Sequence, residues 1–477
     1  MNKETRIQKI QFIIERDKDN LFGKTEIPWN DKLESKNVYL IPLEYLVYNK
    51  YNGRILSRTQ SLEKQNYIID VETEEGRKRI EDLLWHSNEY RNKTTQISID
   101  KYGQQKVGII TKDGIIIDGN RRVMLLNKGK KYDYFKAVVL DVTLEENPLE
   151  IEKLETTYQM GEDEKVGYNA TEKYIKSKLL YKKLTQKTYS SNSDKHTPDN
   201  NTIEKIATWM GIDKAEVFTY LDTMEVMDEY LEFLEYDGIY TQLDKREDPF
   251  LNLTKWLKTF YNTESRKGFD GYRNDDVDDL KAIAFDYIRA KYEGKEFRIL
   301  AEGLRPNHFF GDKEIWKSFI KYHNDRIKKI HESEIDYNST NLNKHLDDRD
   351  AKFLESTRLN GKDSFLAENI EIHKERLGYN RASDEPQKLV EKSFDSLNAV
   401  KTGHKSFTTK EVQQKLEDLG NKVFKMLQQK SPSRILSHII TQLKEIEASK
   451  ITEIDKEEFE TKLKEIQKLC FGLNKKL

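Results

Sequence analysis

The chain has little of several residue types that mark common protein classes. Its single cysteine, Cys470, excludes a disulfide framework and a thiolate metal cluster, and it fits a reducing compartment. The 8 prolines and 22 glycines are few for 477 residues, which favours a mostly helical fold. No apolar run approaches the roughly 20 residues that a membrane-spanning helix needs, and the charged segment Met1–Asp17 is not typical of a secretory signal. We therefore expect a cytoplasmic protein without membrane contact.

The chain also lacks an excess of positive or negative charge. The 82 basic and 84 acidic residues give a net charge of -2, so the protein as a whole is not attracted to nucleic acid. Any contact with DNA must therefore come from a local basic patch. A chain of this length predicts two to four domains.

The segment Gly114–Leu126 carries the most information, and it reads GIIIDGNRRVMLL. Its isoleucine run predicts a buried strand, and the Asp118-Gly119 pair predicts a tight turn. Asn120 is expected to cap the helix that follows, which begins with Arg121 and Arg122. The sequence therefore predicts a strand, a turn and a helix start within a few residues.

This arrangement suits a phosphate group. A helix N-terminus offers unpaired N–H groups and a partial positive charge, and the guanidinium groups of Arg121 and Arg122 add bidentate donors. The alternative is an ordinary helix start whose arginines pair with local carboxylates, because 35% of the residues are charged.

The rest of the N-terminal part alternates strands with helices. Strands are predicted at Tyr39–Ile41, Val107–Thr111 and Asp133–Val142, and a helix at Glu75–Trp85. Together they indicate a small α/β domain, followed by helices, so the fold class is α+β and mostly helical. The predicted domains are 36–146 (α/β), 147–235 (helical), 236–385 (helical, of unknown role) and 386–477 (C-terminal helices).

The later part of the chain reads as helices separated by polar connectors. Ser190–Asn201, Glu332–Asp350 and Gly378–Pro386 are predicted to be loops. The last hundred residues predict three amphipathic helices that dimerise or recruit a protein partner. Their apolar positions are Val412, Leu416, Leu419, Val423 and Leu427 in the first; Ile435, Leu436, Ile439, Ile440 and Leu443 in the second, which Ser433 would cap; and Phe459, Leu463, Ile466 and Cys470 in the third.

Thr202–Met224 has helix-turn-helix spacing, with Gly211 at the turn. Thr202 and Asp213 are the expected N-caps of its two helices. If this segment binds DNA, Lys214, Phe218 and Thr219 would face the major groove. The alternative is a plain helical hairpin, because the second helix begins with two acidic residues and one basic residue.

Other site chemistry is poorly represented. The histidines do not form a metal-binding HxxxH or HExxH pattern, and no Walker loop is present. Asp70 and Glu72 follow a short apolar run and could be the carboxylate pair of a metal-dependent nuclease, although such pairs are usually solvated.

The order of these pieces resembles the N-terminal domain of the ParB family, within the ParB/sulfiredoxin superfamily. The resemblance rests on Ile41-Pro42-Leu43, Asn52-Gly53-Arg54, the GQQKVGIIT segment Gly103–Thr111 and the arginine-pair segment Asp118–Leu126, with the helix-turn-helix after them. It covers about two fifths of the chain, and residues after about Leu234 match nothing in the family.

The resemblance implies a domain that binds CTP or ATP with Mg²⁺, and a homodimer that closes around DNA as a clamp or sensor, associated with the nucleoid. On this basis Arg121 and Arg122 contact phosphates, and Gly119 allows close approach of the backbone. Arg54 and Gln105 would reach the same nucleotide.

Three departures from the family pattern bear on catalysis. Asn120 stands where the family has a metal-holding glutamate, and a neutral amide binds Mg²⁺ less strongly than a carboxylate does. The family's second catalytic motif would align with Leu154–Met160, where only Glu155 is kept. We expect Glu155 and Asn120 to hold the metal, and Glu155 and Asp118 to support slow hydrolysis. Asn120 also replaces the cysteine of sulfiredoxins, which excludes thiol repair.

Two alternatives stay open beside a CTPase or ATPase clamp. One is a metal-dependent DNase on the same scaffold, acting in defence against foreign DNA. The other is a helical interaction protein without catalytic activity that still binds a nucleotide or phosphate.

Overall fold

The computed structural model describes residues 1–160, 169–191, 199–261, 265–302, 307–337, 342–358, 361, 363–381, 385–428, 432–447 and 456–476. The chain divides into two compact units, Met1–Arg381 and Ala382–Leu477. The first unit contains a small mixed sheet and many helices, and the second is helical where it is described. The protein is therefore mostly helical with one small sheet, as the composition predicted. The four predicted domain ranges stay predictions.

The sheet has five strands in the order β1-β2-β5-β3-β4. β3 pairs with β5 in parallel, and the other neighbours are antiparallel. Six helices accompany the sheet, and η1 is a short 3₁₀ turn. The elements are α1 (Lys3–Asp17), β1 (Lys24–Trp29), β2 (Lys32–Pro42), η1 (Leu43–Tyr45), α2 (Leu56–Lys64), α3 (Glu74–Ser87), α4 (Glu89–Tyr102), β3 (Gly108–Ile110), β4 (Ile116–Asp118), α5 (Asn120–Gly129), β5 (Tyr134–Val139) and α6 (Pro148–Met160).

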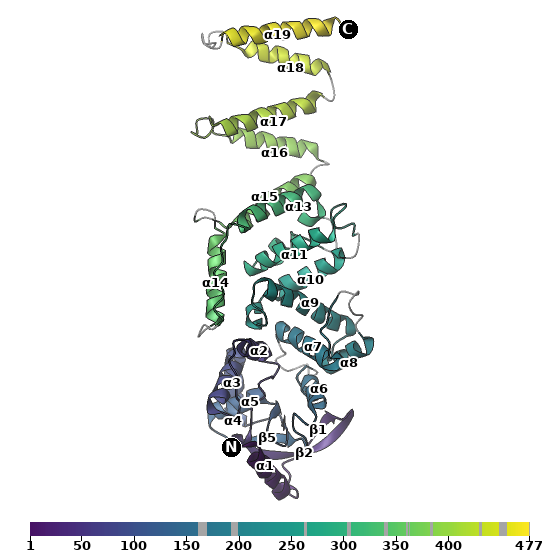
Figure 1. Ribbon diagram of the computed structural model, residues 1–477, viewed down its shortest axis with the longest axis vertical. Helices are drawn as coiled ribbons and strands as arrows, with labels where there is room; N and C mark the ends of the chain where they lie inside the picture. Colours follow the sequence, from purple (N-terminus) through teal and green to yellow (C-terminus); the bar gives the residue numbers. More distant parts are fainter. Residues whose placement is uncertain are drawn as a thin grey trace. The chain divides into compact units, whose positions relative to one another are not determined.

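Both faces of the sheet are covered (Figure 1). Tyr39, Ile41 and Phe135 point into one core, which they share with α1, α3, α4 and α5. Their strand neighbours Val38 and Val138 point into a second core, which α6 completes. This alternation follows from the two-residue period of a strand. It also explains why the strands read as apolar runs, because both of their faces are buried.

The predicted helix at Glu75–Trp85 and the three predicted strands are confirmed, within a few residues, as α3, β2, β3 and β5. Four elements carried too little pattern to be predicted. α1 was taken only as a charged segment, although Arg6, Ile10 and Ile13 are buried at helical spacing. α2 and α4 were missed because most of their side chains are polar, and β1 because its apolar residues do not alternate with polar ones.

Helices build the rest of the first unit around a large core. The predicted loop Glu332–Asp350 is wrong in its second half, because α14 begins at Leu342 and buries Leu346 and Phe353, whereas residues 332–337 lie outside helices and strands. The many charged residues of this segment suggested an exposed loop. In the structure, however, Asp350 is buried and forms ion pairs with Arg246 and Arg289. The helices are α7 (Ala170–Thr185), α8 (Asn200–Met210), α9 (Lys214–Phe233), α10 (Glu247–Phe260), α11 (Asn274–Arg289), α12 (Gly294–Arg298), α13 (Lys313–Ile327), α14 (Leu342–Ser356) and α15 (Phe365–Arg381), with short 3₁₀ turns η2 (Tyr240–Leu243) and η3 (Phe309–Gly311).

The other two predicted loops coincide partly with described residues. Ser190–Asn201 lies mostly outside them, and its last two residues belong to α8. Within Gly378–Pro386, α15 continues to Arg381 and α16 begins at Pro386, and residues 382–384 lie outside the described ranges.

The second unit contains four described helices where three were predicted. The additional helix is α16, and Ser433 lies inside α18 and does not cap it. In the described residues of this unit no side chain is buried. The helices are α16 (Pro386–Asn398), α17 (Lys410–Gln428), α18 (Pro432–Glu445) and α19 (Lys456–Asn474). Within the described ranges, no helix has the length and apolar character needed to cross a bilayer.

Candidate functional site

The turn from β4 into α5 is built on Gly119. This residue has φ 115°, and a Cβ atom there would lie 2.4 Å from Cζ of Phe135. A side chain is therefore excluded on both conformational and steric grounds. Gly119 also takes the N-cap position, so the prediction that Asn120 caps the helix is wrong, and Asn120 is the first helical residue.

Asn120 ties three parts of the domain together. Its Oδ1 accepts a hydrogen bond from the backbone N–H of Asn49 at 2.9 Å, and its Nδ2 donates to the carbonyl of Ile116 at 3.0 Å. The side chain is buried. Asn120 therefore fixes the turn after β2 against the end of β4.

The two arginines that follow have different environments. Arg122 donates from Nη2 to Asp118 Oδ2 at 2.5 Å and from Nη1 to the carbonyl of Lys106. Its guanidinium also lies 5.8 Å from the centre of the Phe135 ring. Arg122 and Asp118 therefore form an ion pair with each other. For Arg122 this is the alternative given in the sequence analysis, an arginine paired with a local carboxylate.

Arg121 has only neutral hydrogen-bond partners among the described residues. Its Nε donates to Asn92 Oδ1 at 2.5 Å and its Nη2 to Thr95 Oγ1 at 3.0 Å. Asn92 is fully buried, and its own Nδ2 donates to the carbonyls of Leu84 and Trp85. A guanidinium group has five N–H donors, and the other three have no acceptor in the described chain. α4 thus holds Arg121 rigidly and leaves most of its donors available.

Two more arginines surround this group. Burial, with the nearby charges of Arg54 and Arg91, lowers the pKa of Arg121 to about 10. Arg54 comes from the turn after β2, where its N–H donates to Asn52 Oδ1 at 3.2 Å, and Arg91 is in the first turn of α4. The structure therefore brings three positive charges from three elements to the N-terminal turn of α5.

Arg91 was not predicted from the sequence. It lies about thirty residues from Arg121 in a helix that had no clear apolar period, and nothing in its neighbours marks it. Only the packing of α4 against α5 brings it to Arg121.

Glu155, a residue of α6, contacts the turn that carries Arg54. Its carboxylate is buried and accepts weak hydrogen bonds from Asn49 Nδ2 at 3.5 Å and Asn52 Nδ2 at 3.4 Å. Burial raises the pKa of Glu155, although Lys176, 3.7 Å away, opposes the shift. For the neighbouring Glu152, burial also raises the pKa, but Lys176 and Lys183 outweigh it and hold the value at about 2.

These contacts bear on the predicted magnesium site. The oxygen of Asn120 accepts a backbone hydrogen bond, and the carboxylate of Glu155 faces Asn49, Asn52 and Lys176. No group of three or more histidine, cysteine, aspartate or glutamate side chains that could hold a metal ion occurs in the described part of the chain. The residues present do not fit a protein-held Mg²⁺ ion, and we assign neither of them to a metal.

Gln105 is exposed, and its Nε2 donates to the carbonyl of Tyr102 at 2.6 Å. The buried glutamine of this segment is Gln104, whose amide pairs with the backbone of Lys136. No contact in the described structure joins Gln105 to the arginines, so its predicted role stays a prediction.

The helix-turn-helix geometry is present in α8 and α9. Gly211 takes the left-handed turn with φ 67°, and Asp213 caps α9 by accepting from the N–H of Glu216 at 2.7 Å. The cap of α8 is Asp199, because this residue accepts from the N–H of Thr202, which was the predicted cap.

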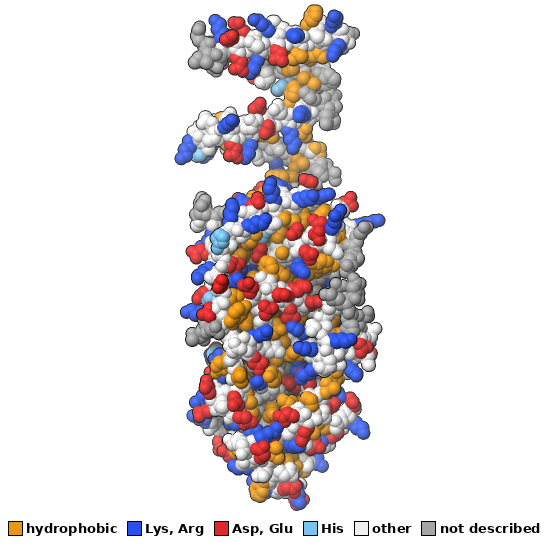
Figure 2. Space-filling model, viewed as in Figure 1, with side chains coloured by type: hydrophobic (Ala, Val, Ile, Leu, Met, Phe, Trp, Pro, Cys, Tyr) orange, Lys and Arg blue, Asp and Glu red, His pale blue; other side chains and the backbone are white. Residues whose placement is uncertain are grey.

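The three residues predicted to contact DNA have partners within the protein. Lys214 pairs with Glu204 at 3.0 Å, Phe218 packs against the helical core, and Thr219 donates to the carbonyl of Ala215. α9 packs against α7, α8 and α10. On the face shown in Figure 2, basic and acidic side chains are interspersed on the first unit. The DNA contact stays a prediction.

The carboxylate pair considered for a nuclease is also engaged. Glu72 accepts two hydrogen bonds of 2.8 Å from the buried guanidinium of Arg6, and Asp70 Oδ1 accepts from the N–H of Glu72 at 3.0 Å. These contacts fix α1 to the turn that precedes α3, and no observation on the described residues favours the nuclease hypothesis.

Comparison with family models, curated proteins and solved structures found no match to this chain.

Proposed function

We propose that the first unit binds the phosphate groups of a nucleoside triphosphate, CTP or ATP, at Arg54, Arg91 and Arg121. The observation that carries the proposal is the environment of Arg121, a half-buried guanidinium with neutral partners and two cationic neighbours. An anion bound there would accept hydrogen bonds from the remaining N–H groups of Arg121. It would also offset the repulsion among the positive charges of Arg54, Arg91 and Arg121.

The position of the cluster supports a phosphate ligand. It surrounds the first turn of α5, where the backbone N–H groups have no partner within the helix. The resemblance of Asp118–Leu126 to the ParB arginine-pair motif adds the nucleoside part of the ligand to the proposal.

The proposal differs from the family pattern in two respects. Arg122 is a structural residue, because Asp118 and the Lys106 carbonyl use its donors. Hydrolysis is not included, since the residues expected to support it, Asp118 and Glu155, are engaged with Arg122 and Lys176. Nucleotide binding without turnover fits both a DNA-associated sensor and an interaction protein.

Thermal unfolding of the full chain with CTP, ATP, GTP, UTP and inorganic triphosphate, each with and without Mg²⁺, tests the proposal. A ligand at about 100 times its dissociation constant should stabilise the protein by about 2.7 kcal/mol. R121A should abolish the shift. The matched control is R79A, which removes an exposed arginine of the same unit. Equal shifts in R121A and wild type, or none with any triphosphate, would refute the assignment.

We infer separately that the second unit pairs with a second copy of the chain. Its helices carry apolar residues at alternating spacings of three and four, and these side chains are exposed, for example Phe394 (66%), Val423 (48%) and Phe471 (75%). A standard interface buries about 800 Å² per partner, and all four helices offer exposed apolar side chains that could contribute to it. Basic and acidic residues are both present along the helices, which suits another copy better than a partner of one charge sign.

Sedimentation equilibrium of the full chain tests this inference. V423D should shift the protein from dimer to monomer, because it places a charge in the apolar stripe. Q414D adds the same charge at an exposed polar position of α17 and should leave the dimer intact. A wild-type monomer at all concentrations would show that the four helices pack within one chain.

A further inference from the structure

A cleft of about 1060 Å³ lies in the helical part of the first unit, between α15 and the segment that joins α11 to α12. Its lining includes the apolar side chains of Ile299, Ala367 and Ile370, and Tyr292 is half-buried among them. The end of α14 closes one side through Thr357, whose Oγ1 accepts from Ser364 Oγ at 2.8 Å. The volume is at the upper end of the range for small-molecule pockets, about 300–1,000 Å³, and is large enough for several amino-acid residues.

Charged side chains of both signs surround this apolar lining. None of them pairs with another of the set within 4.0 Å in the described structure, and Arg298 alone of the set has an ion-pair partner outside the cleft, Asp248 at 3.9 Å. Ion pairs between exposed side chains are weak. Because the charges on the two walls are not paired with one another, they are available to a ligand. The set consists of Lys291, Lys295, Arg298, Arg358 and Lys374, with Glu296, Glu302, Asp363 and Glu371.

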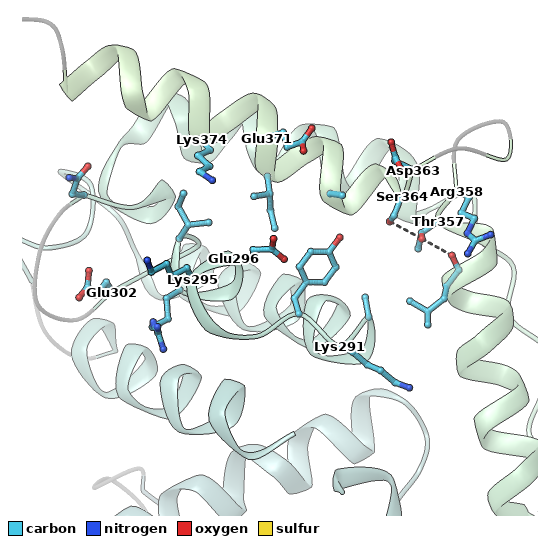
Figure 3. Close-up of a pocket in the computed structure, with 18 of the residues that line it drawn as sticks. Lys291, Lys295, Glu296, Glu302, Thr357, Arg358, Asp363, Ser364, Glu371 and Lys374 are labelled. Atoms are coloured by element: carbon cyan, nitrogen blue, oxygen red, sulfur yellow. Dashed lines mark hydrogen bonds between the residues drawn. The ribbon is translucent and has the colours of Figure 1, made fainter. Parts of the chain in front are cut away.

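Both walls of the cleft carry a base and an acid (Figure 3). Glu371 and Lys374 are on α15, which forms one wall, and Glu296 and Lys295 are on the opposite wall. Both carboxylates act on Tyr292: burial raises its pKa, and the charges of Glu296 and Glu371 raise it further. A carboxylate from each wall therefore lies near the tyrosine, and each wall also supplies a lysine.

This combination narrows the class of ligand. Four carboxylates among five basic side chains leave the cleft almost neutral, which does not suit a nucleic acid backbone, and nine charged side chains do not suit a lipid chain. A carboxylate pair beside an aromatic ring suits an ammonium or guanidinium group, and a lysine pair suits a carboxylate. A ligand that offers both groups on an apolar frame is a polypeptide.

We propose that this cleft binds a short polypeptide segment of a partner protein that carries both a basic and an acidic side chain. The basic side chain would lie between Glu296 and Glu371, over the ring of Tyr292. The acidic side chain would reach Lys295 and Lys374, and apolar side chains would contact Ile299 and Ile370. The inference is independent of the nucleotide proposal, because the cleft is built from other helices.

Selection of short random peptides displayed on phage, with the full chain as target, tests the proposal. The enriched peptides should share a basic and an acidic residue at fixed spacing. The double variant E296K/E371K should weaken their affinity, measured by fluorescence anisotropy, by at least about tenfold. K295E/K374E should weaken it as well, through the acidic residue of the peptide.

The matched control is E293K/E375K, which makes the same change in net charge at two exposed positions outside the cleft. It should bind the selected peptides as the wild type does. Peptides without a basic residue, equal affinity of E296K/E371K and the control, or no enrichment would each overturn the proposal. All the substituted side chains are exposed, so unchanged thermal unfolding is expected and excludes misfolding as the cause.

Discussion

The two units of the chain carry similar amphipathic helices but treat their apolar faces differently. In the described part of residues 1–381 most apolar side chains lie in shared cores, and charged groups such as Arg289 and Asp350 are buried with partners. In the described residues of the second unit, equally regular apolar stripes remain exposed (Figure 2). An amphipathic pattern thus predicts a helix, but it does not say whether the covering surface lies in the same chain.

The largest effect should come from the buried ion pairs of the first unit. Arg289 donates to Asp350 at 2.8 Å and to Glu332 at 2.6 Å and 2.9 Å, and it is almost fully buried. R289A should destabilise the protein by about 3–5 kcal/mol in urea unfolding, because it leaves the buried carboxylate of Asp350 short of a partner. The exposed R79A should cost less than about 0.5 kcal/mol. If R289A also lowers the free energy of unfolding by less than about 0.5 kcal/mol, water replaces the ion pair.

A second effect depends on pH. Burial raises the pKa of Glu172 to about 7, against 4.5 in the unfolded chain, although its bonds from Ser57 oppose the shift. Between these values the folded state holds a proton that the unfolded state loses, so stability should fall as the pH rises from about 4.5 to 7. The loss from this group is at most about 3 kcal/mol. E172Q should flatten the stability profile measured by urea unfolding, and an unchanged profile would contradict the assignment.

A third effect compares two glycines of the first unit. G119A should destabilise the protein by about 1–3 kcal/mol, because Gly119 has φ 115° and a Cβ would meet Phe135. G378A should be neutral or stabilise by up to about 1 kcal/mol, because Gly378 is in α15 with open space around it. Thermal unfolding of both variants measures the difference, and equal effects would show that the β4–α5 turn is less constrained than its geometry indicates.

The smallest effect sharpens the comparison of the units directly. If the helices of the second unit are stabilised by a second copy, dilution should lower the far-UV helical signal by part of their contribution only. The first unit should keep its helicity, since its cores are complete within one chain. A signal independent of concentration would indicate that the second unit is stable by itself.

The candidate site was predictable in part. The sequence around Asp118–Arg122 predicted a strand, a turn and a helix start, because turn residues and apolar runs act locally along the chain. The division of labour between Arg121 and Arg122 was not predictable. It depends on which side chains α4 and the turn after β2 place around them, and these come from distant parts of the chain.

The sequence by itself determined the mostly helical class, the main strands of the first unit and the amphipathic stripes of the second, because these follow from the spacing of apolar residues along the chain. Only the tertiary structure decided that Arg91 lies beside Arg121, that α14 buries its charges, and that charges of both signs line one cleft. The physical reason is that charged side chains gain or lose their partners through packing, and packing joins residues that local patterns cannot relate.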